Sequence, residues 1–205
     1  MRLAIIGASG HGKVVADAAE LNGWQEVVFF DDAWPGVGVN GPWQVEGTTS
    51  DYLSRLNSFE GVVVAIGSNK IRAAIQHRIT QAGGELVSII HPTAVVSRHA
   101  EVLAGTVVLA NAVVNPSATI GMGCIVNTGA VVEHDCDVGA FSHLSPNAVL
   151  AGGVAIGEQV WIGAGALVKQ LVAIGNHVTV GMGSVVLADV GSGNTVAGVP
   201  ARLLG

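Results

Sequence analysis

From Val96 onward an aliphatic residue returns at every sixth position, without a slip, as far as Val186. Two positions before each of these sixteen residues lies a small or β-branched side chain. A period of six differs from the 3.6-residue period of a helix and is typical of a β-solenoid with short strands and tight corners. Because side chains alternate along a strand, both series are predicted to point into the solenoid.

Three six-residue repeats would form one triangular coil, so residues 18 apart are expected to stack on one another. The sixteen repeats then make about five coils. Glycine or asparagine often follows the aliphatic residue, as at Gly121, Asn127 and Gly139. We expect these residues to adopt the unusual backbone angles of the corners.

The first 90 residues follow a different pattern, in which short apolar strands alternate with helical segments. This alternation predicts a parallel α/β sheet of Rossmann type. We therefore expect an α/β domain in residues 1–90 and a β-solenoid domain in residues 91–205. The expected strands are 2–7, 26–32, 61–67 and 85–92, and the expected helices are 14–24 and 69–84.

Composition excludes several classes of protein. The formal charge of −6 and a pI near 5.5 argue against a nucleic-acid binder, which would carry a basic patch. No apolar run approaches the roughly 18 residues of a membrane span, so no membrane insertion is expected. The apolar run at the N-terminus is too short for a signal peptide, which favours a cytoplasmic protein. Cys124 and Cys136 occupy the small-residue positions of the repeat and are expected to be buried hydrophobic side chains.

A glycine-rich turn, 7-GASGHGK-13, follows the first strand and opens a helix. Backbone N–H groups at a helix N-terminus attract phosphates. Val14 replaces the Ser or Thr that binds magnesium in a P-loop, which argues against a nucleotide-hydrolysing site. Its spacing, G-x-x-G-x-G, also departs from the dinucleotide fingerprint. The remaining alternatives are a diphosphate-containing nucleotide bound without hydrolysis, and a turn that merely requires glycines.

A charged triplet interrupts the solenoid at Glu133, His134 and Asp135. The residues 18 before and after His134 are Pro116 and Gly152, so the fold itself does not require this triplet. Histidine is the usual general base near neutral pH, and a neighbouring carboxylate would fix its tautomer. Either Glu133 or Asp135 is a candidate for that carboxylate, and an exposed histidine without a task is the alternative.

Several motifs together resemble a known family. They are GASGHGK, FFDD, AIGSNKIR, VNTGAVVEHDC, FSHLSPNAVLAGGV and the terminal AGVPARLLG. This set closely resembles the nucleotide-sugar acetyltransferases of the sialic acid O-acetyltransferase type, which include the N-acetyltransferases of the bacillosamine and perosamine pathways. The resemblance covers nearly the whole chain. It implies a left-handed parallel β-helix and a homotrimer, with acetyl-CoA bound between adjacent solenoids, a nucleotide sugar as the other substrate and no metal.

The resemblance also implies roles for individual residues of the solenoid. His134 matches the catalytic base and Asp135 the acid that supports it. Asn127 matches an asparagine near the reacting sugar. The residues that match acetyl-CoA contacts are His143, Ala164 and Met182.

In the α/β domain the resemblance implies a binding site for the nucleotide sugar. Ser9, Gly10 and His11 match the turn that binds the diphosphate. Asp31 and Asp32 match contacts to the nucleoside. Gly67 matches a further substrate contact.

The activity expected from these residues is transfer of acetyl from acetyl-CoA to the amine of a UDP- or GDP-linked 4-amino-4,6-dideoxy sugar. No serine or cysteine nucleophile is evident, which favours direct transfer within a ternary complex over an acyl-enzyme. O-acetylation of a sialic acid or a related sugar hydroxyl is an alternative. A non-catalytic binding or scaffold protein is a second alternative, although it leaves the charged triplet unexplained.

Overall fold

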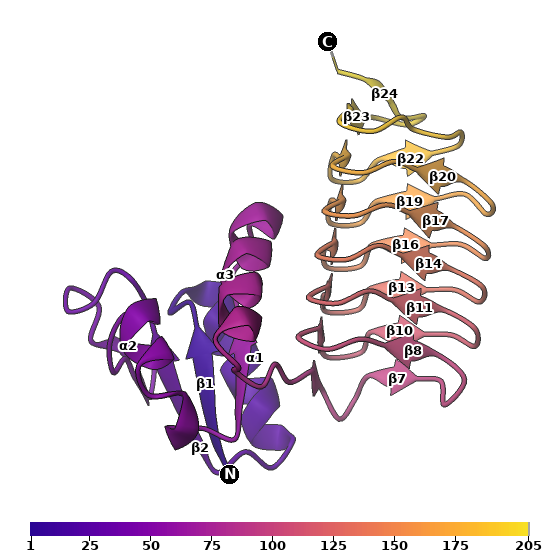
Figure 1. Cartoon of the computed structure of the whole chain (residues 1–205). Helices are drawn as coiled ribbons and strands as arrows, with labels where there is room; N and C mark the ends of the chain where they lie inside the picture. Colours follow the sequence, from indigo (N-terminus) through magenta and orange to yellow (C-terminus); the bar gives the residue numbers. More distant parts are fainter. Residues whose placement is uncertain (205) are drawn as a thin grey trace.

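The structure is a computed structural model, and it describes residues 1–204. An α/β domain lies beside a long solenoid of stacked coils, and the helix α3 (Asn69–Gln81) runs along the side of the solenoid (Figure 1). The predicted fold classes, a Rossmann-like α/β sheet and a β-solenoid, are therefore confirmed.

The α/β domain is built on three parallel strands in the order β2-β1-β5. Apolar clusters cover both faces of this sheet, which explains why its strands read as continuous apolar runs. One face packs on α1 together with side chains of the solenoid, and the other packs on α2 and α3. The elements are β1 (Arg2–Ile6), α1 (Gly10–Leu21), β2 (Glu26–Phe30), β3 (Val39–Asn40), β4 (Trp43–Gln44), α2 (Thr49–Leu53), η1 (Leu56–Ser58) and β5 (Gly61–Val64).

The solenoid has three walls of short strands, which we call sheets I, II and III. Sheet I contains β7 (Val95–Val96), β10 (Val113–Val114), β13 (Val131–Val132), β16 (Val149–Leu150), β19 (Leu167–Val168) and β22 (Val185–Val186). Sheet II contains β8 (Glu101–Val102), β11 (Thr119–Ile120), β14 (Asp137–Val138), β17 (Ala155–Ile156) and β20 (Ala173–Ile174). Sheet III contains β6 (Ile89–Ile90), β9 (Val107–Val108), β12 (Ile125–Val126), β15 (His143–Leu144), β18 (Trp161–Ile162), β21 (Thr179–Val180), β23 (Thr195–Ala197) and β24 (Arg202–Leu203).

Strands of successive coils pair in parallel with a register of 18 residues, as predicted; Val113 pairs with Val131. Both inward series form one continuous buried core along the solenoid. The solenoid is longer than the repeat count indicated. Pairing begins at β6, inside the segment assigned to the α/β domain, and ends at β23, which pairs with β21 at a register of 16.

The expectation for the corner glycines is wrong. The left-handed backbone angles fall on the third residue after the aliphatic position, as at Asn111, Gly123 and Asp135. The glycines directly after the strands of sheet II instead form a column of close approach between coils. A Cβ added to Gly139 would lie 2.4 Å from the backbone carbon of Gly157 in the next coil. These positions need glycine for space and not for backbone freedom.

Helix α3 joins the two domains through three polar side chains on one face. Asn69 donates to the carbonyl of Gln159, and Gln76 donates to that of Gly105. Between them, fully buried Arg72 donates to the carbonyls of Gly123 and Phe141. The four solenoid carbonyls belong to residues exactly one coil apart, so α3 is docked on four successive coils.

We predict that Gly139→Ala lowers the thermal unfolding midpoint, because its Cβ has no space against the backbone of the next coil. The expected loss is about 2–3 kcal/mol of stability. Gly165→Ala is the matched control: its Cβ would meet nothing within 4 Å, so only its left-handed backbone (φ +67°) is strained. Thermal unfolding of both variants checks this, and a larger loss for Gly165→Ala would contradict it.

Candidate active site

His134 and Asp135 form a hydrogen-bonded pair on the edge between sheets I and II. His134 Nδ1 lies 2.7 Å from Asp135 Oδ2, and both side chains are exposed. Glu133, the other candidate partner, accepts a hydrogen bond from Asn115 instead. The imidazole is therefore oriented by Asp135, which leaves Nε2 facing away from this partner.

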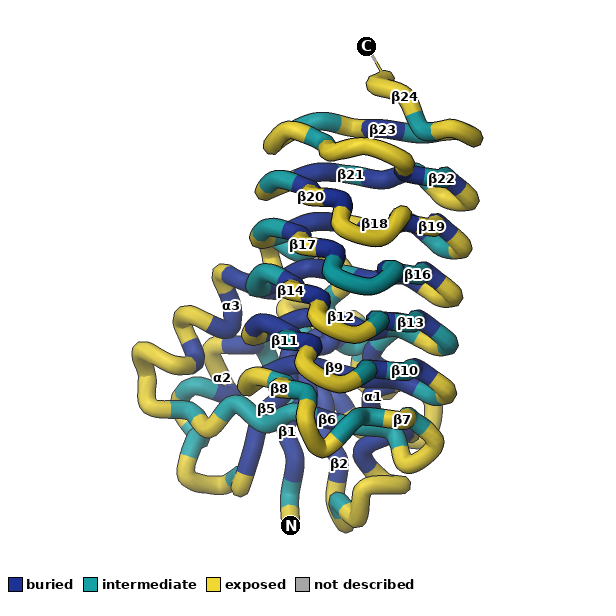
Figure 2. Tube along the Cα trace, turned by 90° about the vertical axis from the view of Figure 1, so that its right-hand side faces the viewer, coloured by how far each residue is buried: buried dark blue, intermediate teal, exposed yellow. Residues whose placement is uncertain are grey.

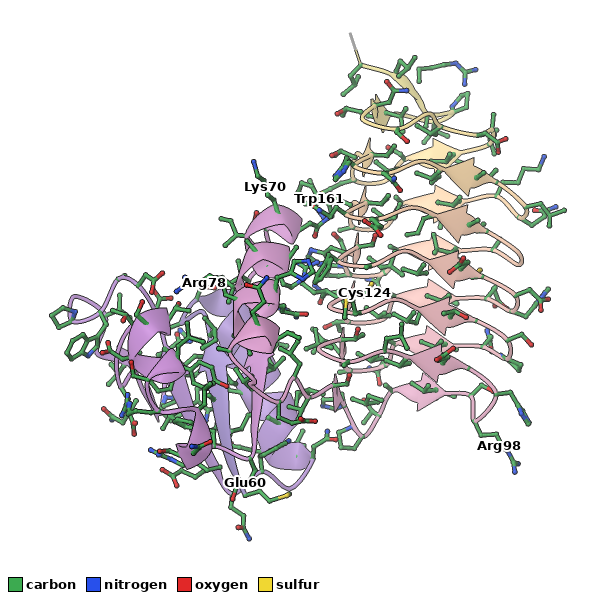
Figure 3. All side chains as sticks on the ribbon, in the orientation of Figure 1. Glu60, Lys70, Arg78, Arg98, Cys124 and Trp161 are labelled. Atoms are coloured by element: carbon green, nitrogen blue, oxygen red, sulfur yellow. The ribbon has the colours of Figure 1, made fainter. Side chains whose placement is uncertain are left out.

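Gly152 provides the space for this imidazole. A Cβ at Gly152 would lie 2.6 Å from Cε1 and 2.7 Å from Nε2 of His134, so the ring lies over the glycine of the next coil. The edge between sheets I and II faces away from the α/β domain, and Figure 2 looks directly onto it. In Figure 3 Arg98, two coils below His134 in the same column, marks this far edge.

The predicted diphosphate-binding turn leads into α1, and the first backbone N–H groups of this helix have no partner within the helix. Ser9 is the N-cap residue, but its side chain makes no capping hydrogen bond. The first N–H groups of a helix have no partner within the helix, so those of Gly10 and His11 are free to bind an anion. Gly12 is required here, because a Cβ would lie 2.3 Å from the carbonyl oxygen of Gly7.

The acids at the end of β2 are bonded to neighbouring backbone. Asp31 accepts from the N–H groups of Ala8, in the glycine turn, and of Ala33. Asp32 accepts from the N–H of Thr49 at the start of α2. Asp31 thus holds the glycine turn against β2. The roles of Asp31 and Asp32 as nucleoside contacts stay predictions.

Aromatic rings from both domains meet at the junction. The ring of His143 lies between those of His11 and Trp161, with centroid distances of 6.4 Å on each side. His143 Nε2 also lies 3.1 Å from Asn127 Nδ2. The structure therefore brings His11, His143 and Asn127 together, as a shared binding site requires.

Both junction histidines are held in the neutral form. Burial, reinforced by the charge of Arg72, lowers the pKa of His11 from 6.5 to about 4. Burial likewise lowers the pKa of His143 to about 3, reinforced by Arg72 and His11 and opposed by a backbone contact with Gly67. His11 Nε2 is buried without a hydrogen-bond partner. Its predicted contact with a ligand therefore requires the backbone or the other ring nitrogen.

A pocket of about 440 Å³ opens at this junction. Its lining contains Gly67 and His143, both predicted site residues, together with Trp161, which was not predicted. Trp161 is half-exposed and its Nε1 donates to Ser145. It pairs with His143 of the preceding coil, and Figure 3 shows it facing the start of α3 beside Lys70. An aromatic residue at an outward repeat position was the signal for it in the sequence.

The two remaining coenzyme candidates lie on the edge between sheets III and I. Ala164 and Met182 are one coil apart, just beyond β18 and β21, and Met182 is 78% exposed. Within one chain, the predicted residues thus fall into two groups on different edges. His134 and Asp135 form one group, and the other lies around the junction and the neighbouring edge.

Comparison with known proteins agrees with this architecture. The sequence profile described as the PglD N-terminal domain matches residues 2–79. The acetyltransferase domain of PglB from Neisseria gonorrhoeae FA1090 is 43% identical, with 99% of both chains covered and a TM-score of 0.94. The chain belongs to the family of sugar N-acetyltransferases.

Further relatives of this family support the fold. The PglB domain has also been solved with acetyl coenzyme A. PerB from Caulobacter crescentus, solved with CoA and GDP-perosamine, is 37% identical over 100% of this chain and 98% of that one, with a TM-score of 0.94. They share the Rossmann-like domain and the left-handed β-helix. The comparisons support membership of the sugar N-acetyltransferase family, but they do not show the sialic acid O-acetyltransferase type.

A curated relative, UDP-N-acetylbacillosamine N-acetyltransferase of Bacillus subtilis (strain 168), is 34% identical over 110 residues. These residues are 53% of this chain, and the match spans about half (51%) of that relative's length. In residues 1–204 no helix is long and apolar enough to cross a membrane. The same residues contain no cluster of three or more side chains suited to hold a metal ion.

We predict that acidification below pH 6.5 destabilises this sugar N-acetyltransferase homologue. The folded-state pKa values of His11 and His143 lie below the ordinary 6.5, so between those values only the unfolded chain takes up the protons. The free energy of unfolding should therefore fall as the pH falls from about 6.5 toward 4. Urea denaturation across this range measures it. His11→Asn should show a shallower loss, and equal slopes for both proteins would contradict the assignment.

Proposed function

We propose that the protein transfers the acetyl group of acetyl-CoA to the amine of a nucleotide-linked amino sugar. The observation that carries this proposal is the His134–Asp135 pair, whose histidine keeps Nε2 available on an exposed edge. Family membership supports the reaction class, because relatives of 37–44% identity are solved with acetyl-CoA, or with CoA and GDP-perosamine. The nucleotide sugar would place its diphosphate on the N-terminus of α1, near Ser9, Gly10 and His11.

We infer that the site is completed by a second subunit of a homotrimer. The outward residues of sheet I form an unbroken aliphatic column, whereas those of sheet II are polar or small. Val95 and Leu167 are 63% and 45% exposed in the single chain, which favours burial against other copies. The column consists of Val95, Val113, Val131, Val149, Leu167 and Val185.

Threefold symmetry about sheet I explains why the site residues lie on different edges. If each subunit turns sheet I toward the axis, the I–II edge of one subunit meets the III–I edge of the next. His134 of one subunit then faces Ala164 and Met182 of its neighbour. The junction pocket and glycine turn of that neighbour lie on the adjoining wall.

The proposed chemistry follows from this arrangement. The sugar amine attacks the thioester carbonyl, and Nε2 of His134 accepts the proton that the amine loses. Asp135 holds Nδ1 and stabilises the imidazolium that forms. The tetrahedral intermediate collapses as the C–S bond breaks, and the departing CoA thiolate takes up the proton held on Nε2 of His134, which restores the base. Held geometry in the ternary complex supplies much of the rate.

The direct test is release of free thiol from acetyl-CoA. The acceptor panel contains UDP- and GDP-linked 4-amino sugars together with free and CMP-linked sialic acid. We expect release with one amino sugar. Release only with a sialic acid would replace N-acetylation by O-acetylation, and failure to bind acetyl-CoA would contradict the enzyme proposal.

We predict that His134→Ala lowers turnover by about 10²–10⁴-fold, the usual contribution of a general base. The exposed side chain packs into no core, so the thermal unfolding midpoint should stay unchanged. His99→Ala, an exposed histidine on the same edge, is the control and should keep full turnover. Near-normal turnover of His134→Ala would refute the role of general base.

We predict that Val149→Lys dissociates the trimer and abolishes transfer, because it places a charge within the aliphatic column. Ala155→Lys is the matched control, since it lies in the same coil on the outer face of sheet II. Light scattering after size-exclusion chromatography should give a monomer for Val149→Lys and a trimer for Ala155→Lys. Equal masses would contradict the proposed interface.

A further inference from the structure

Arg72 is a buried cation without an acidic partner. Its side chain is only 1% exposed, and among residues 1–204 it forms no ion pair with Asp or Glu. Burying an unpaired charge is costly unless every donor is satisfied. Here the N–H groups of the guanidinium donate only to uncharged oxygen atoms, and five of these are backbone carbonyls. They are the carbonyls of Ile66, Gly67, Gly123, Phe141 and Ser142, together with Asn69 Oδ1.

These acceptors come from two parts of the protein that must be held together. On the α/β side, Nη1 donates to Ile66 at 2.9 Å and to Gly67 at 3.3 Å, in the turn between β5 and α3. On the solenoid side, Nε donates to Gly123 at 2.7 Å and Nη2 to Phe141 at 2.6 Å. One rigid, planar group therefore spans the turn and two coils of the solenoid.

Asn69 and Gln76, the other two polar residues of α3 that bond the solenoid, link fewer parts of the protein than Arg72 does. The side chain of Gln76 donates a hydrogen bond to the carbonyl of Gly105, and within residues 1–204 it forms no hydrogen bond with the Gly67 turn. That of Asn69 bonds the solenoid at Gln159 and Val160 and accepts from Arg72. Arg72 is thus the residue of α3 whose side chain links the Gly67 turn directly to the solenoid.

The two ends of this link carry walls of the junction pocket. Gly67 lines the pocket itself, and Phe141 lies two residues before the pocket residue His143. We propose that Arg72 is a positioning residue that sets the relative position of the Gly67 turn and His143, which line the same pocket. The inference rests on the proposed function, in which the junction pocket holds the nucleotide sugar beside the coenzyme.

This role predicts a specific kinetic signature. A nucleoside diphosphate without its sugar would bind the α/β domain alone, and acetyl-CoA would bind the solenoid alone, at His143, Ala164 and Met182. Neither ligand spans the junction of the two domains. Only the whole nucleotide sugar reaches from one domain to the other, so it alone requires the Gly67 turn and His143 in their proper relative position. A misplacement of about 1 Å can lower turnover by up to about 10²-fold.

The experiment compares Arg72→Lys with Gln76→Leu in the full-length enzyme. Lysine keeps the charge but loses the planar fork, so it cannot bond the turn and both coils at once. Gln76→Leu breaks an equivalent bond to the solenoid without touching the turn. The readouts are kcat and KM for the amino-sugar acceptor found by thiol release, Kd for UDP, GDP and acetyl-CoA, and the unfolding midpoint.

We expect Arg72→Lys to lower kcat/KM for the amino sugar by about 10–100-fold while the three Kd values stay within about twofold. Gln76→Leu should lower the unfolding midpoint with little change in kcat/KM. Equal loss of kcat/KM in both variants, or loss of UDP, GDP and acetyl-CoA binding in Arg72→Lys, would reduce Arg72 to a structural residue and overturn the proposal.

A crystal structure of Arg72→Lys separates this proposal from the proposed function. If no acceptor supports thiol release, the enzyme proposal fails, but the position of the turn is still measurable. We expect the distance between the rings of His11 and His143, 6.4 Å in the wild-type protein, to change by about 1 Å or more. An unchanged distance would overturn the positioning role.

Discussion

The arrangement of the two domains depends on a match between two periodic structures. One turn of an α-helix rises about 5.4 Å, and stacked strands lie about 4.8 Å apart. Polar residues three to four positions apart on α3 can therefore reach carbonyls of neighbouring coils, and Arg72 covers the remaining difference because its guanidinium bonds two coils. Asn69, Arg72 and Gln76 use this match to bond Gln159, Phe141, Gly123 and Gly105. Because these carbonyls are backbone groups of a rigid repeat, the α/β domain is held at a defined height along the solenoid.

The repeat also makes departures from it informative. Every coil offers the same three edges, and most edge positions carry small or flexible side chains. The His134–Asp135 pair occupies an edge where the neighbouring coils carry Pro116 and Gly152. Gly152 leaves room for the imidazole, so the coil above is adapted to the pair. This pair lies away from the α/β domain of its own chain. We therefore propose that a second subunit completes the site.

The sequence was sufficient for the features that repeat. The six-residue period predicted the solenoid, its 18-residue register and its inward residues, because a slip of one residue would turn the core outward. The backbone of the corners was predicted less well. Gly121 and Asp135 are both compatible with a corner, and only the structure separates a glycine needed for space from a residue in left-handed conformation.

Contacts between the domains were beyond the reach of sequence patterns. Asn69, Arg72 and Gln76 lie at helical spacing, but a polar stripe ordinarily faces solvent. The burial of these side chains depends on solenoid carbonyls 29 to 91 residues away in the chain. The role of Trp161 likewise depends on the side chain stacked one coil below it. The aliphatic column of sheet I was not recognised from the sequence, although its members recur every 18 residues from Val95 to Val185.

The central claim is that His134 of one subunit acts on a sugar bound by its neighbour. The most direct measurement is activity of trimers refolded from an equal mixture of His134→Ala and Gly10→Asp chains. Gly10→Asp places a carboxylate at the predicted diphosphate site, where a Cβ meets nothing within 4 Å. Each variant alone should be inactive. In randomly mixed trimers, about one quarter of the sites would combine two intact halves, so about a quarter of wild-type activity should return. No recovery in verified mixed trimers would contradict a site shared between subunits.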